Sequence, residues 1–119
     1  MNLVELLLTI QNQLKIFHWQ TKSYAEHKAL DDAYGTLTDL FDEFLETYMG
    51  KYGRPKAENQ FTINLENYSE NYISCIKTFK LIVQKDLSKA FSEEDTDLLN
   101  LRDEILGALN KLCYLLSLK

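Results

Sequence analysis

Two short groups of side chains are spaced so that they could bind a metal ion. His27 and Asp31 are four residues apart, as are Asp42 and Glu46, and residues four apart lie next to each other on a helix. At 100° per residue, the four side chains fall within a sector of roughly 100° of one helix. Imidazole and carboxylate groups are ligands for iron, zinc and manganese. The pattern therefore predicts a metal-binding face on one long helix.

The two groups are too far apart to share one ion within a single chain. Their centres are about 15 residues apart, which is roughly 22 Å along a helix. If two copies of this helix cross antiparallel about a twofold axis near Gly35 and Thr36, each 42/46 pair approaches the partner's 27/31 pair. A glycine inside a helix costs about 1 kcal/mol relative to alanine, and close approach of two backbones would explain it. The spacing thus predicts a homodimer.

Four helices are expected to position these groups. The first runs from about residue 3 to residue 19, and the second follows Ser23, a predicted N-cap, and continues to about residue 52. The third covers about 67–90, and the fourth begins after Ser92. The expected fold class is all-α, in one domain spanning residues 1–119.

The segment between the second and third helices is long. Residues 54–66 are polar and contain the only proline, so we expect a connection without a helix. About 13 extended residues span roughly 40 Å, enough to return the chain along the bundle. The third helix would then run parallel to the second, as in a ferritin-like four-helix bundle with a long crossover connection.

Apolar residues that recur at steps of three or four predict the core faces of the first, third and fourth helices. They are Leu3, Leu7, Ile10, Leu14 and Phe17; Tyr72, Ile76, Phe79 and Val83; and Leu98, Leu101, Ile105, Leu109, Leu112 and Leu116.

Composition excludes several classes of function. The net charge is −5 and no run of Lys or Arg occurs, so DNA binding is unlikely. No apolar stretch reaches the roughly 20 residues of a membrane span. Cys75 and Cys113 are far apart and have apolar neighbours, so we expect thiols that pack as small apolar groups in a cytoplasmic protein.

The stretches 18–19, 27–32 and 42–46 together resemble the ferroxidase signature of the Dps mini-ferritins. The resemblance implies that His18, with the 27/31 pair of one subunit and the 42/46 pair of its twofold mate, holds iron at the dimer interface. There Fe(II) would be oxidised by peroxide or dioxygen; zinc or manganese are alternative metals. Trp19 would lie beside the site, and twelve subunits could form a storage shell.

The sequence also departs from that family. The two histidines are nine residues apart, closer than in typical members, and Thr47 stands where an arginine commonly follows the last glutamate. A mobile basic tail and a separate short helix in the connection are missing, so a dimer could be the whole assembly. His18 could instead bond carbonyl groups at the helix end. The alternative function is a helical dimerisation or scaffold protein that keeps this fold without catalysis.

Overall fold

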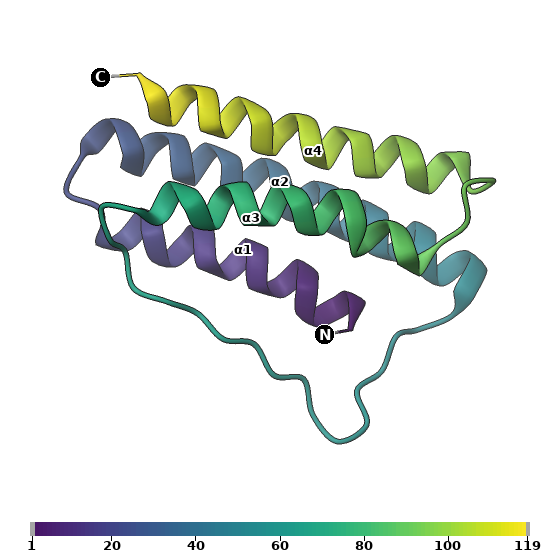
Figure 1. The fold of residues 1–119 in the computed structure, drawn as a ribbon. Helices are drawn as coiled ribbons and strands as arrows, with labels where there is room; N and C mark the ends of the chain where they lie inside the picture. Colours follow the sequence, from purple (N-terminus) through teal and green to yellow (C-terminus); the bar gives the residue numbers. More distant parts are fainter. Residues whose placement is uncertain (1, 119) are drawn as a thin grey trace.

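The protein is a bundle of four helices in a computed structural model that describes residues 2–118 (Figure 1). The helices are α1 (Leu3–Gln20), α2 (Tyr24–Tyr52), α3 (Tyr72–Lys85) and α4 (Thr96–Ser117), and a short 3-10 helix, η1 (Leu87–Ala90), follows α3. No strand occurs among the described residues. The prediction of an all-helical bundle is confirmed.

The core lies where the apolar faces of the helices meet. α2 packs against α1 and α4, and α3 packs against α4. The predicted core residues of α1, α3 and α4 are all buried except Leu3, which is partly exposed. Leu14, on α1, has no exposed surface, and truncating such a side chain to alanine costs about 2–5 kcal/mol.

Local side-chain contacts determine where α2 begins. Ser23 Oγ accepts a hydrogen bond from the Glu26 amide, as predicted for an N-cap. The Glu26 carboxylate does not complete a capping box, because it accepts hydrogen bonds from Thr21 Oγ1 and the Tyr68 hydroxyl instead. The start of α2 is therefore tied both to the end of α1 and to the segment that leads into α3.

A long irregular segment, residues 53–71, connects α2 to α3 and passes along the outside of the bundle beside α1 (Figure 1). We call this segment the strap. The buried Gln13 of α1 holds it at Glu66, whose amide donates to Gln13 Oε1 at 2.7 Å and whose carbonyl oxygen accepts from Gln13 Nε2 at 2.8 Å. As expected, the strap brings α3 back to run in the same direction as α2.

The third helix is shorter than the predicted range of 67–90, because α3 begins at Tyr72 and is followed by η1. Gln20, the last residue of α1, accounts for the late start. Its Oε1 accepts from the Tyr68 amide at 2.6 Å, and its Nε2 donates to Asn67 Oδ1 at 2.9 Å. These bonds hold residues 67 and 68 against α1 in place of a helical turn.

The two cysteines are free and half-buried. Burial and, to a smaller extent, the nearby Glu66 carboxylate together raise the pKa of the Cys75 thiol to about 12. Both side chains pack against the core as the sequence predicted. In residues 2–118, no helix is both long and apolar enough to cross a membrane.

Candidate metal site

The two histidines lie together at the corner where α1 meets α2. His18 is near the end of α1 and buried, and His27 is in the first turns of α2 and exposed. Their rings stack with centroids 3.9 Å apart and an interplanar angle of 20°. The turn at residues 21–23 is short, so the nine-residue separation in sequence places the imidazoles in contact.

Each histidine bonds the backbone of the other. His18 Nδ1 donates to the His27 carbonyl oxygen, and His27 Nδ1 donates to the His18 carbonyl oxygen, both at 2.8 Å. Since a carbonyl oxygen can only accept, Nδ1 carries a proton in both rings, and in the neutral form of such a ring Nε2 keeps its lone pair. His18 thus bonds a carbonyl oxygen of α2 and not, as the alternative interpretation expected, one at the end of its own helix; the carbonyl oxygen near the end of α1 is bonded by His27. These bonds leave each Nε2 available as a ligand, and a hydrogen bond from the other ring nitrogen is typical of metal-binding histidines.

Asp31 extends this cluster by one turn of α2. Its Oδ1 lies 3.9 Å from His18 Nε2, and its side chain is 54% exposed. Two atoms that each bind one ion at about 2.1 Å are about 3.4 Å apart in tetrahedral geometry. The observed separation of His18 Nε2 and Asp31 Oδ1 exceeds that distance by about half an ångström.

Asp42 and Glu46 lie farther along α2 and are exposed. With Asp39, Glu43 and Thr47 they line a shallow hollow of about 300 Å³ that has no basic lining residue. The hollow is acidic and open to solvent.

The structure brings His18, His27 and Asp31 together, but not the 42/46 pair. Among the described residues, no group of three or more His, Cys, Asp and Glu side chains is arranged to hold a metal ion within one chain. The union of the two groups across a twofold axis stays a prediction that requires a second copy.

Two further residues of the predicted interface are open to solvent. A Cβ added at the exposed Gly35 would meet no atom within 4 Å, so no contact within the chain requires glycine there. Trp19 is 65% exposed. Its ring lies 5.6 Å from Lys15 Nζ.

Lys15 also belongs to this corner and was not among the predicted site residues. Its Nζ lies 4.0 Å from Asp31 Oδ1, the same oxygen that faces His18 Nε2. A signal was present, because Lys15 precedes His18 by three residues and so shares its side of α1.

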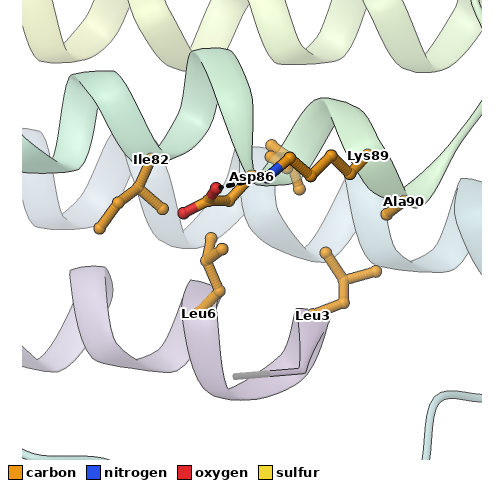
Figure 2. A pocket seen from close by; sticks show the side chains of 7 residues that line it. Leu3, Leu6, Ile82, Asp86, Lys89 and Ala90 are labelled. Atoms are coloured by element: carbon orange, nitrogen blue, oxygen red, sulfur yellow. Dashed lines mark hydrogen bonds and ion pairs between the residues drawn. The ribbon is translucent and has the colours of Figure 1, made fainter.

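A larger cavity lies near the other end of α1 and contains none of the predicted site residues. Leu3 and Leu6 of α1 face Ile82 of α3 across it, and the ion pair of Asp86 and Lys89 lies beside it (Figure 2). Its volume is about 500 Å³. The cavity is mostly apolar and contains no histidine, so it is not a second candidate for the predicted metal chemistry.

Fold and side chains together define a four-helix bundle with a cluster of histidine and carboxylate groups at one corner. The chain belongs to a family of unknown function (DUF5856), whose model matches residues 18–116. It is 33% identical over 114 residues to an uncharacterized 14.6 kDa protein from the mobD-ri intergenic region of enterobacteria phage T4. That alignment covers 96% of this chain and 84% of the relative. No solved structure matches the chain.

Proposed function

We propose that this protein is a ferritin-like, Dps-like protein that binds iron between two copies and oxidises Fe(II) with peroxide or dioxygen. One copy supplies His18, His27 and Asp31, and its twofold mate supplies Asp42 and Glu46. If twelve copies close into a shell, the protein also stores the oxidised iron; a dimer alone would consume peroxide and detoxify Fe(II).

One observation carries the proposal: the Nδ1 of both imidazoles is bonded to a carbonyl oxygen, so that Nε2 is the nitrogen left to bind an ion, and the Asp31 carboxylate lies 3.9 Å from the Nε2 of His18. A core histidine that serves only packing has no need of an exposed carboxylate beside its second nitrogen. The direction of α3 relative to α2, set by the strap, supports the ferritin-like part of the proposal.

The residues of the site would bind the ions and stabilise charge, while the iron supplies the redox chemistry. Two Fe(II) ions give one electron each to one peroxide, which takes up two protons and leaves as two waters. The charge of the two ions rises by two in total. The carboxylates of Asp31, Asp42 and Glu46 favour that change because negative groups stabilise Fe(III) more than Fe(II).

The test combines particle mass with metal uptake. Light scattering gives the number of copies, and elemental analysis after anaerobic Fe(II) loading gives the iron bound per chain. The double variant Asp42→Asn, Glu46→Gln should lose iron while retaining its helical circular dichroism. Asp39→Asn is the matched control, since Asp39 lines the same hollow but is outside the predicted pattern. Unchanged iron uptake by the double variant would refute the site.

Gly35 provides an independent test of the twofold contact. Within one chain Gly35→Ala meets no obstacle, so in a monomer it should stabilise the helix by about 1 kcal/mol. If two α2 helices approach closely there, the added methyl groups would weaken self-association instead. Analytical ultracentrifugation and thermal unfolding of this variant distinguish the two results.

A non-catalytic scaffold is the second candidate function. It draws on the exposed Gly35 of α2, because no contact within the chain requires a glycine there and a close contact between two copies would. A scaffold would dimerise through α2 but would not accelerate the appearance of ferric absorbance after addition of Fe(II) and peroxide. The proposed ferroxidase would exceed the rate in buffer.

A further inference from the structure

Lys15 lies beside Asp31, at the corner where the proposed metal ion would bind. Its Nζ lies 4.0 Å from Asp31 Oδ1 and faces two aromatic rings, with 4.6 Å to the centroid of Tyr34 and 5.6 Å to that of Trp19. The Lys15 side chain is 28% exposed. The ammonium group is thus enclosed by one carboxylate and two aromatic faces.

The ammonium and the imidazole of His18 share a single carboxylate oxygen. An ion bound at about 2.1 Å from Asp31 Oδ1 would lie no more than about 6 Å from the present position of Lys15 Nζ. Two positive charges at that distance repel each other. Metal binding to Asp31 and continued pairing of Lys15 with the same oxygen are therefore in competition.

We propose that Lys15 is the resident counter-ion of Asp31 in the metal-free protein, and that a divalent ion binds by separating its ammonium group from the Asp31 carboxylate while the contacts with the rings of Trp19 and Tyr34 are kept. This inference rests on the proposed metal site and adds a residue that sets its affinity. The two aromatic faces, which the ammonium already contacts, continue to hold the cation after it leaves the carboxylate, because the face of an aromatic ring attracts positive charge. Lys15 then acts through Asp31 as a positioning residue and is not itself a ligand.

The test uses zinc, which is redox-inert, and the full-length protein. Zn²⁺ affinity is measured by calorimetry for the wild type and for Lys15→Met, which keeps the apolar stem and removes the charge. The variant should bind Zn²⁺ on the order of tenfold more tightly. Lys15→Arg keeps the charge and should bind like the wild type, and Lys77→Met, on α3, controls for a general loss of positive charge.

Trp19 supplies a readout that a merely structural role of Lys15 would not change. It is the only tryptophan of the chain, so its fluorescence reports on the ammonium beside it. Addition of Zn²⁺ should shift the emission of the wild type, and the shift should be largely absent in Lys15→Met because no ammonium moves.

The outcomes separate this inference from the proposed site. If Lys15→Met binds Zn²⁺ more tightly than the wild type, or binds it when the wild type does not, the role of Lys15 is supported. If both bind with equal affinity, the role of Lys15 is refuted while the site stands. If neither binds Zn²⁺, the site itself is refuted, and this inference with it.

Discussion

Two corners of the bundle each contain an aspartate paired with a lysine, yet they are built differently. At one corner the exposed Asp31 has Lys15 and His18 at about 4 Å, farther than hydrogen-bond distance. At the other corner the buried Asp95 accepts hydrogen bonds from Lys51, from the Tyr52 hydroxyl and, at 2.9 Å, from the Ser92 amide. The carboxylate of Asp95 is saturated and that of Asp31 is open.

The difference separates a structural carboxylate from one available to a ligand. Asp95 ties the end of α2 to the start of α4, and its contacts leave little capacity for another partner. Asp31 holds no short hydrogen bond in the structure and has two nitrogen groups nearby. An ion that bound at Asp31 would replace weak contacts, whereas one that bound at Asp95 would have to break strong ones.

The largest expected effect is on metal affinity at the open corner. Asp31→Asn should lower Zn²⁺ affinity by on the order of 100-fold, because it removes a charged ligand of the proposed site. The unfolding temperature should change little, since the side chain is more than half exposed. Calorimetry measures the Zn²⁺ affinity, and thermal unfolding measures the stability. A large loss of stability with unchanged Zn²⁺ affinity would mean that Asp31 is a structural carboxylate and not a metal ligand.

Asp95→Asn should lower the stability of the fold and leave the Zn²⁺ affinity unchanged. The amide keeps the size of the side chain but places a donor against Lys51, Tyr52 or the Ser92 amide, so the unfolding temperature should fall by roughly 5 °C or more. Zn²⁺ affinity should be that of the wild type. Asp86→Asn is the matched control, since its ion pair with Lys89, at 3.5 Å, is exposed and should contribute little. Similar unfolding temperatures for the two variants would mean that the buried network is not stabilising.

The hydrogen bonds around Asp95 also predict how the stability of the fold depends on pH. Hydrogen bonds from Lys51 and Tyr52 lower the pKa of Asp95 to about 2. An unfolded aspartate has a pKa of about 3.9, so this carboxylate stabilises the fold above about pH 4, and its contribution is lost as the pH falls from about 4 to about 2. Denaturant unfolding across this range should show a steeper loss of stability for the wild type than for Asp95→Asn. Parallel curves would contradict the assignment.

The smallest predicted effect concerns the helix start beside the histidines. Ser23→Ala removes the N-cap of α2 and should cost about 1 kcal/mol, while Ser23→Gly should cost only a few tenths. Denaturant unfolding measures both. Equal losses for the two variants would mean that the hydroxyl does not cap α2, despite its bond with the Glu26 amide.

Local sequence patterns predicted most of the fold. The apolar residues of α3 and α4 recur with the helical period, and α2 ends at the glycine at position 53, whose φ of 85° favours that residue. The late start of α3 could not be read locally. It depends on Gln20, which bonds residues 67 and 68 from 47 or more positions away.

Only the proximity of three of the predicted site residues can be compared with the structure. The spacing of His27 and Asp31 is a local property of one helix, and the structure places both beside His18. The stacked rings and their reciprocal bonds depend on the angle of the turn between α1 and α2, which no spacing rule supplies. Lys15 does not fit a pattern of metal ligands, because it is a cation that would compete with a metal ion for Asp31.

The most direct test of the central claim is subunit complementation between two variants that each lack one half of the site. His27→Ala keeps the 42/46 pair, and Asp42→Asn, Glu46→Gln keeps the histidines, so neither homodimer has a complete site. If the site spans two copies, mixing the variants under conditions that exchange subunits creates heterodimers with one complete and one empty site. The account predicts that Zn²⁺ binding, absent from each variant alone, returns on mixing at about one ion-binding site per heterodimer. No recovery after demonstrated exchange, or full binding by either variant alone, would contradict it.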